Sequence, residues 1–216
     1  VSVENVDVTG SARVGGLVGT NRGTVTTSSV TGTVSGSVPV GGLIGDNRGT
    51  VTASYAISTV SGFDNDKFVV PGSDVVGGLV GYNGGQVSDS YATGAVTGEN
   101  TFTGGLVGEN RDTITESYAI GTVSGDGDNY AGGLVGHNSG EVTDSYWDKG
   151  MTNQKDAIAF GDEANLTGFG TVGADEPAAE MTGGDALDSG NMDAFTDTWS
   201  TNGNSGGPLF YPTLTA

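Results

Sequence analysis

The chain has 216 residues, including 41 glycines and 5 prolines, and its 26 acidic and 7 basic residues give a formal net charge of −19. This length fits one domain or one repeat array with a cap, and the low proline content argues against collagen-like and proline-rich disordered chains. The negative charge argues against nucleic acid and anionic membrane surfaces as partners. Cysteine is absent, which excludes disulfides, thiol catalysis and cysteine-ligated zinc.

A repeated glycine motif organises the first two thirds of the chain. The sequence GGLVG, once with isoleucine, occurs five times, at intervals of 26, 36, 27 and 28 residues. The second glycine of each copy is Gly16, Gly42, Gly78, Gly105 and Gly133. The long interval is interpreted as one coil plus an insertion at about residues 63–72.

Each copy continues with short stretches rich in Val, Thr, Ile and Tyr, separated by Gly and Asn. This pattern is typical of strands and turns, and it has no helical period. We expect three strands of about 4 to 6 residues per coil, stacked on equivalent strands above and below. The fold class predicted is therefore all-β, a parallel β-helix (β-solenoid) of 26–28-residue coils with an irregular C-terminal cap.

Two columns of identical residues are predicted along this stack. The inward aliphatic column is Leu17, Leu43, Leu79, Leu106 and Leu134. The second column, expected at a turn because Asn tolerates left-handed geometry, is Asn21, Asn47, Asn83, Asn110 and Asn138. A structural role is favoured for the asparagines, and a row of ligands is the alternative.

A tyrosine column has two interpretations. It comprises Tyr55, Tyr91, Tyr118 and Tyr146. Small residues alternate with these tyrosines, so the rings either form an ordinary packed ladder or face solvent and stack on glycan rings.

The two ends of the array differ. Residues 2–10 align with residues 28–36, so the chain is expected to begin inside a coil. The solenoid is assigned to residues 1–148 and the cap to residues 149–216, with a short helix near 185–194. The longest apolar runs fall far short of about 20 residues, so no direct membrane insertion of this segment is expected, and any export signal or anchor is expected outside it.

The motif GGLVG, the asparagine column and the pattern SYAxGxVSG together resemble the GLUG-motif repeat family. Similar repeats occur in exported bacterial and archaeal surface proteins, some with attached immunoglobulin-A-cleaving metallopeptidases. The acidic bias further resembles haloarchaeal members. The peptidase chemistry is not expected here, because the chain has no HExxH motif and a single histidine, His137. That histidine is interpreted as an exposed turn residue.

Several acidic residues are candidates for other chemistry. Calcium is a minor hypothesis at two acidic loops, with the pairs Asp64 and Asp66, and Asp126 and Asp128, as ligands. A polysaccharide-acting site would need clustered acids, for which Asp74, Asp89 and Asp144 are further candidates. No catalytic residue is assigned.

Three arginines and one asparagine complete the candidate residues. Arg22, Arg48 and Arg111 recur after the asparagine column and are expected to pair with acids of adjacent coils. Asn165 begins an Asn-Leu-Thr triplet, a candidate glycosylation site.

These observations favour a non-enzymatic structural or adhesive module at the extracellular surface of a halophilic microbe. High salt would screen the self-repulsion of so acidic a chain. The expected partners are other copies or flanking domains of a longer surface protein, and glycans. The alternatives are a self-assembling filament or sheath subunit that stacks through its open coil end, and a polysaccharide-acting enzyme.

Overall fold

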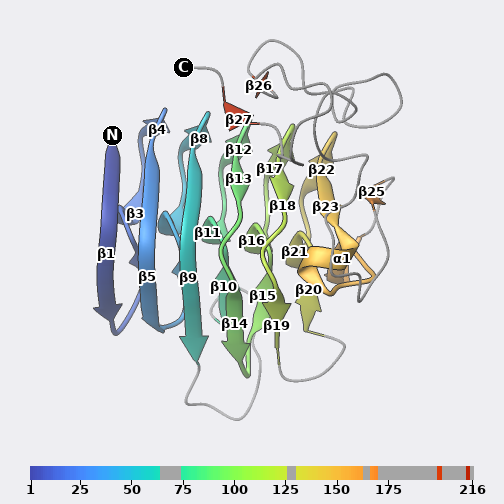
Figure 1. Cartoon of the computed structure of the whole chain (residues 1–216), viewed down its shortest axis with the longest axis horizontal. Coiled ribbons are helices and arrows are strands. Elements are labelled where there is room, and N and C mark those ends of the chain that lie inside the picture. Colours follow the sequence, from blue (N-terminus) through green and yellow to red (C-terminus); the bar gives the residue numbers. More distant parts are fainter. Residues whose placement is uncertain (64–73, 126–129, 163–165, 170–198, 201–212, 215–216) are drawn as a thin grey trace, which may run out of the picture.

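The computed structural model describes residues 1–63, 74–125, 130–162, 166–169, 199–200 and 213–214. These residues form parallel strands stacked as a β-solenoid of about five turns, which confirms the predicted fold class. In Figure 1 the coils follow one another from β1 at the left to β23 and the helix α1 at the right. Each coil crosses four parallel sheets, which we call A to D, and not the three strands expected.

Sheets B, C and D each receive one short strand from a coil, whereas some coils contribute two strands to sheet A. Sheet A contains β1 (Ser2–Gly10), β5 (Ser29–Ser37), β9 (Tyr55–Phe63), β13 (Tyr91–Ala92), β14 (Val96–Glu99), β18 (Tyr118–Ala119), β19 (Val123–Ser124), β23 (Tyr146–Asp148) and β25 (Thr167–Phe169). Sheet B contains β2 (Val14–Gly15), β6 (Val40–Gly41), β10 (Val75–Gly77), β15 (Phe102–Gly104) and β20 (Ala131–Gly132). Sheet C contains β3 (Val18–Asn21), β7 (Ile44–Asn47), β11 (Val80–Asn83), β16 (Val107–Asn110), β21 (Val135–Asn138) and β24 (Ile158–Gly161). Sheet D contains β4 (Thr24–Thr26), β8 (Thr50–Thr52), β12 (Gln86–Ser88), β17 (Thr113–Thr115) and β22 (Glu141–Thr143).

Equivalent residues of successive coils are register partners in the repeats from Val6 onward. In sheet D, for example, Val51 pairs with Val87 and Val87 pairs with Ile114. Sheet B pairs Val76 with Val40 across the long interval, so the register is kept although that interval is about ten residues longer than the others. Of the predicted insertion at residues 63–72, only Phe63, the last residue of β9, is described.

The hydrophobic core is a continuous column inside the coils. Leu43, Leu79, Leu106 and Leu134 are 0 % exposed, whereas Leu17 in the first coil is only partly buried. The β-branched residues of sheets C and D and the alanines of sheet A pack against the leucines. In a second cluster, the valines of sheet B pack against Val34, Val60 and Val96 of sheet A. Because no coil could bury these side chains alone, stacking supplies most of the hydrophobic stabilisation.

The second glycine of the GGLVG motif is required by close backbone approach. A Cβ atom at Gly78 would collide with the carbonyl oxygen of Gly105 in the next coil and would lie 2.9 Å from the Cβ atom of Ala92. Only a residue without a side chain fits here, and the facing residue in sheet A must also be small. The motif is therefore a packing requirement of the stack.

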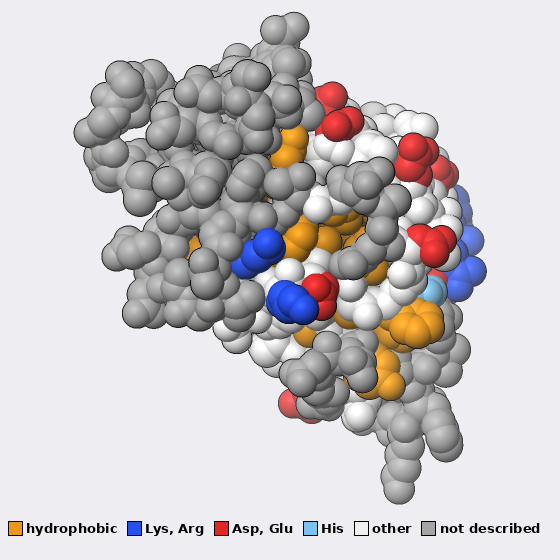
Figure 2. Space-filling view, turned by 90° about the vertical axis from the view of Figure 1, so that its right-hand side faces the viewer, with side chains coloured by type: hydrophobic (Ala, Val, Ile, Leu, Met, Phe, Trp, Pro, Cys, Tyr) orange, Lys and Arg blue, Asp and Glu red, His pale blue; other side chains and the backbone are white. Residues whose placement is uncertain are grey.

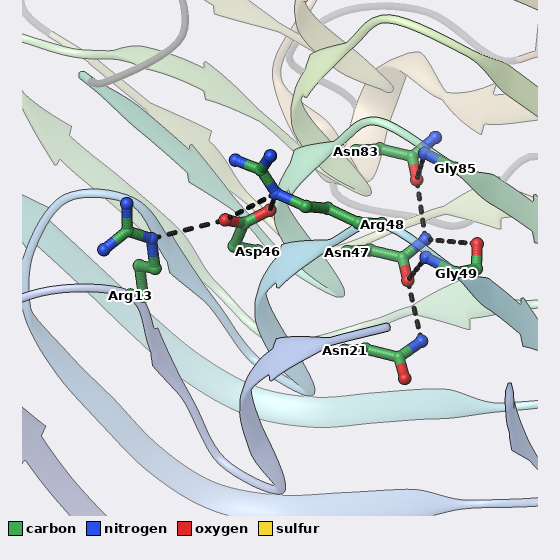
Figure 3. A network of polar contacts seen from close by, with 8 residues as sticks. All are labelled: Arg13, Asn21, Asp46, Asn47, Arg48, Gly49, Asn83 and Gly85. Carbon is green, nitrogen blue, oxygen red and sulfur yellow. Dashed lines mark hydrogen bonds and ion pairs between the residues drawn. The ribbon is translucent and has the colours of Figure 1, made fainter. Parts of the chain in front are cut away.

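The asparagine column is a ladder of side-chain hydrogen bonds (Figure 3). Each Nδ2 donates to the Oδ1 of the next asparagine at 2.8–2.9 Å, from Asn21 to Asn138. Most of the Oδ1 atoms also accept from the backbone two residues later, as Asn21 does from the N–H of Gly23 at 3.0 Å. The asparagines end the strands of sheet C, and their backbone is not left-handed.

The left-handed turn lies elsewhere, immediately before the serine column. Its residues share φ angles of 47–48°: Thr27, Ala53, Asp89, Glu116 and Asp144. After it, the backbone N–H of Ser28 donates to the Oγ of Ser54, and the same bond recurs from coil to coil up to Ser145. The expectation of left-handed geometry at the asparagines was wrong, because their amides form the turn through side-chain bonds.

The two ends of the stack are built differently. β1 pairs with β5 as the repeat alignment predicts from Val6 to Gly10, but the first two pairs, Ser2–Ser29 and Val3–Val30, are shifted by one residue. At the other end, β24 and β25 extend sheets C and A beyond Asp148, and β22 is the last strand of sheet D among the described residues. Stacked strands thus continue into the segment expected as a cap.

Two small elements complete the described structure. The helix α1 (Lys149–Thr152) begins after Asp148, whose carboxylate accepts from the N–H groups of Gly150 and Met151 at 2.8 and 3.0 Å. β26 (Trp199–Ser200) and β27 (Thr213–Leu214) form an antiparallel pair. The helix expected near 185–194 lies outside the described residues. No helix in the described ranges is long and apolar enough to cross a membrane.

Candidate functional site

One row of side chains on sheet C differs in chemistry from coil to coil. It occupies the third position of each strand, next to the asparagine ladder, and we call it the outer row. Its members are register partners: Thr20, Asp46, Tyr82, Glu109, His137 and Phe160. Because the leucine, asparagine and serine columns each repeat one residue type, a row that varies in this way is a candidate for chemistry specific to this chain.

Asp46 is held by two arginines from different coils (Figure 3). Its carboxylate is 4 % exposed and accepts from the Nε atoms of Arg13 at 3.3 Å and of Arg48 at 3.1 Å. Both guanidinium groups are about half exposed. The bond to Asp46 and its negative charge raise the pKa of Arg48 above its usual value. The carboxylate is thus neutralised, as a buried charge requires.

Glu109 is a fully buried acidic residue. Its side chain is 0 % exposed, and its Oε1 accepts from the Nε of Arg111 and lies 3.5 Å from the Nδ1 of His137. The other oxygen, Oε2, has no hydrogen-bond partner among the described residues. The bond to Glu109 raises the pKa of Arg111.

Tyr82 lies between these two charged groups. The guanidinium carbons of Arg48 and Arg111 lie 5.8 and 5.7 Å from its ring centroid, so both cations contact one ring. The outer row is thereby one continuous polar and aromatic network from Asp46 to Phe160. The arginines at 48 and 111 pair with acids two residues earlier in their own coil, so the expected pairing with adjacent coils was wrong for them. Among the described residues, Arg13 is the arginine that pairs with an acid of an adjacent coil.

His137 is a strand residue and not the exposed turn residue expected. It lies in β21, its side chain is 12 % exposed, and its ring packs against those of Phe102 and Phe160, with centroid distances of 5.2 and 5.4 Å. Figure 2 shows the pale blue histidine beside orange hydrophobic side chains. Its two aromatic neighbours come from sheet B and from a strand beyond the repeats, so the repeat pattern alone could not reveal this burial.

A second group of acids lies in the left-handed column. Asp89, Glu116 and Asp144 occupy it in three successive coils. Burial, a hydrogen bond with Asp89 and the negative charges of Asp89 and Asp144 raise the pKa of Glu116. Asp89 and Asp144 were candidates from the sequence, but Glu116 was missed. The repeat alignment places Glu116 at the same position as these two acids and could have identified it. Asp74 lies apart from them, buried next to β10.

The tyrosine column is a packed ladder. The rings of Tyr55 and Tyr91 stack at 4.8 Å, and those of Tyr91 and Tyr118 at 5.0 Å, with interplanar angles of 4° and 1°. Tyr91, Tyr118 and Tyr146 are 1–6 % exposed, and burial raises the pKa of Tyr91. A glycan could not insert between faces that already contact each other.

The remaining candidate sites fall outside the described residues. This holds for the calcium candidates Asp64, Asp66, Asp126 and Asp128, and for the glycosylation candidate Asn165. Within the part of the chain that the structure describes, no three metal-ligating side chains come together.

The comparisons with known proteins agree with the repeat architecture. Residues 10–35 and 72–97 match the Glug profile, the GLUG motif. Each matched stretch covers a GGLVG sequence and the sheet C and sheet D strands that follow it. The comparison with curated proteins gives no match. The chain therefore carries GLUG-motif repeats, and these repeats build its β-solenoid.

Proposed function

We propose that the chain is a non-enzymatic structural or adhesive module at the outer surface of a halophilic microbial cell. In this role a rigid rod spaces or displays neighbouring parts of a longer surface protein, or adheres to surface glycans. The GLUG-motif repeats and the uninterrupted stack of coils support a structural module, and the resemblance to exported surface proteins supports the location.

The observation that carries this proposal is where the repeated residues lie. The leucine, asparagine and serine columns recur in all five coils, and they pack or bond within the stack. The outer row is among the positions that vary, and its carboxylates are tied to arginines. Residues selected for a repeated ligand or catalytic site would recur on the outside, whereas these recur where they hold the coils together.

Salt dependence tests the halophilic part. With a net charge of −19, the folded chain repels itself, and concentrated salt shortens the screening length to about 3 Å at 1 M. We expect the melting temperature to rise steeply between 0.1 and 2 M KCl. A variant with the exposed Glu4, Asp7 and Glu99 changed to amides should depend less on KCl. Equal stability at low and high KCl would exclude halophilic adaptation.

Binding and sugar-release assays test the surface role. We expect retention on a glycan array at 2 M KCl without any release of reducing sugar from polysaccharides. The matched control is Glu116→Gln, which removes the central acid of the column that an enzyme would use. Sugar release by the wild-type chain that this variant lacks would replace the proposal with a polysaccharide-acting enzyme.

A second candidate function, self-assembly, is favoured by the edge of the stack at β1, against which no further strand pairs among the described residues. β1, β2, β3 and β4 are the outermost strands of their sheets, and Val1 is 74 % exposed. Such edges can pair with another chain. Sedimentation over a concentration series should then show elongating species, and Thr24→Pro, which removes an edge N–H at the start of β4, should suppress them. A monomer at all concentrations would refute self-assembly.

A further inference from the structure

The four arginines of this acidic chain gather along one edge of sheet C. Three of them directly follow the asparagine ladder, where the backbone N–H groups of Arg48 and Arg111 donate to asparagine carbonyls of the preceding coil at 2.8 Å. The fourth, Arg13, reaches this edge through its bond to Asp46. Figure 2 shows blue side chains beside the pale blue histidine of the outer row. We call these four residues the arginine row: Arg13, Arg22, Arg48 and Arg111.

The ring of Tyr82 fills the position where the third coil has no arginine. Gly84 stands there, and its N–H donates to the carbonyl of Asn47 at 2.8 Å, as the arginines do in their coils. A Cβ atom at Gly84 would lie 3.0 Å from Cε1 of Tyr82, so the ring covers this position. Arg48 from the coil before and Arg111 from the coil after both contact the ring. The row is therefore continuous over four coils.

The guanidinium groups of the row are used only in part by the fold. The Nε atoms of Arg13 and Arg48 donate to Asp46, and that of Arg111 donates to Glu109. No described residue accepts a hydrogen bond from the Nη atoms of these arginines, as Figure 3 shows for the first two, and their side chains are 46–57 % exposed. Because the ion pairs and the tyrosine ring already hold the guanidinium groups in place, a ligand would lose less entropy on binding them. Such paired N–H donors match the geometry of a carboxylate.

The shape of the row and the charge around it select a narrow anionic ligand. Arg48 and Arg111 are two coils apart, or roughly 10 Å at about 4.8 Å per coil, so a ligand that pairs with both must carry anions along the stack axis. Asp112 is exposed beside Arg111, and the acids of the left-handed column follow sheet D. A membrane surface or a nucleic acid duplex would cover these acids and be repelled. A single polysaccharide chain with a carboxylate on each sugar is narrow enough to contact the row alone.

We propose that the arginine row binds a linear acidic polysaccharide, whose uronate carboxylates accept from the Nη groups of Arg48 and Arg111. The proposal deepens the adhesive part of the proposed function and rests on it for the choice of a glycan. It assigns that role to one edge of sheet C and to one chemical class of sugar.

The test is a titration of the whole chain against a fluorescent galacturonate oligomer of eight sugars, read by fluorescence anisotropy. The buffer contains 0.5 M KCl, because salt screens the long-range repulsion by the net charge more than a direct contact, and EDTA, so that calcium cannot bridge the ligand to acids. The matched control is the methyl ester of the same oligomer, which keeps the sugars but lacks the charges. We expect the acid to bind at least about tenfold more tightly than the ester, since charge-assisted hydrogen bonds are the stronger ones.

Variants of the chain make the test specific to the row. Glu109→Gln/Arg111→Gln removes one exposed guanidinium and its buried partner, so the net charge stays at −19 and no buried charge is left alone. This variant should bind the oligomer about tenfold more weakly, with its melting temperature as the check on folding. Arg22→Gln and Lys155→Gln each remove one exposed cation, and only the first should weaken binding.

The outcomes separate this proposal from the adhesive function on which it rests. Equal binding of acid and ester, or equal effects of Arg22→Gln and Lys155→Gln, would overturn the proposal. Tighter binding of single-stranded oligothymidylate than of the oligomer would assign the row to nucleic acid and would overturn it as well. Retention of neutral glycans on the array without binding of the galacturonate oligomer would refute the row and leave adhesion standing, whereas silence in both assays would refute both.

Discussion

Changing Asn83 to aspartate should destabilise the solenoid at neutral pH and much less in acid. Asn83 is 0 % exposed, and its Nδ2 donates to Asn110 Oδ1 at 2.8 Å and to the carbonyl of Thr113 at 3.4 Å. Aspartate has the same shape but turns this donor into an acceptor, which would face two oxygens as a buried charge. An unpaired buried charge costs about 3–5 kcal/mol.

The pH dependence separates this charge from the loss of packing. Burial against oxygens raises the pKa of the new carboxyl in the folded chain above the value of about 3.9 in the unfolded chain. The penalty is therefore complete above the folded pKa, shrinks as the pH falls through it, and is smallest below about 3.9. The protonated acid supplies one donor in place of two, so about 1 kcal/mol should remain.

The assay is urea unfolding of wild type, Asn83→Asp and Asn83→Ala between pH 7 and pH 3.5, with differences taken at each pH. Alanine leaves Gly85 N–H and Asn110 Oδ1 without a bond, which costs about 1–3 kcal/mol each at every pH. A penalty for aspartate that stays constant with pH, or falls below 1 kcal/mol at pH 7, would refute the hydrogen-bonded ladder.

Three other substitutions test separate parts of the structure. Leu79→Ala should cost about 2–5 kcal/mol in urea unfolding, because Leu79 is 0 % exposed, whereas Ile57→Ala at a 47 % exposed position should cost far less; equal costs would contradict the core. Asp46→Asn should weaken two ion pairs and lower the free energy of unfolding. The same substitution should cost less in a chain in which Arg13 and Arg48 are already Gln, and an equal cost in both chains would contradict the network. Tyr91 should ionise well above pH 10 in an absorbance titration. Stability should fall as the pH rises above 10, because the phenol loses its proton first in the unfolded chain, and Tyr91→Phe should lessen that fall. Ionisation of Tyr91 near pH 10, as for a free phenol, would place the ring in solvent.

The sequence was sufficient to predict the features that repeat. The period of GGLVG predicted the stacked coils, and the identical residues at one position in each copy indicated which side chains form columns. These inferences work because a stack brings residue i beside its equivalent in the next coil, so sequence spacing becomes spatial contact. Gly78 illustrates the limit: its spacing marked the repeat, but only the structure shows the carbonyl of Gly105 against it.

The features that do not repeat could not be predicted in this way. His137 is enclosed by Phe102 from another sheet and by Phe160 from beyond the repeats. The left-handed column consists of five residues of four different types, so residue preferences for left-handed backbone did not predict it. Side-chain bonds of the neighbouring columns hold it in place.

Disulfide trapping between successive coils tests the solenoid most directly, and a chain without cysteine allows it without background. Thr52 and Ser88 are register partners 36 residues apart, across the long interval, with their hydroxyl oxygens 3.0 Å apart. The double variant Thr52→Cys/Ser88→Cys should form an intramolecular disulfide rapidly under mild oxidation, since register neighbours satisfy its geometry. The control Thr52→Cys/Val87→Cys, whose second side chain faces the core, should not. Equal trapping of both pairs, or trapping of neither, would contradict the stacked register on which the whole account depends.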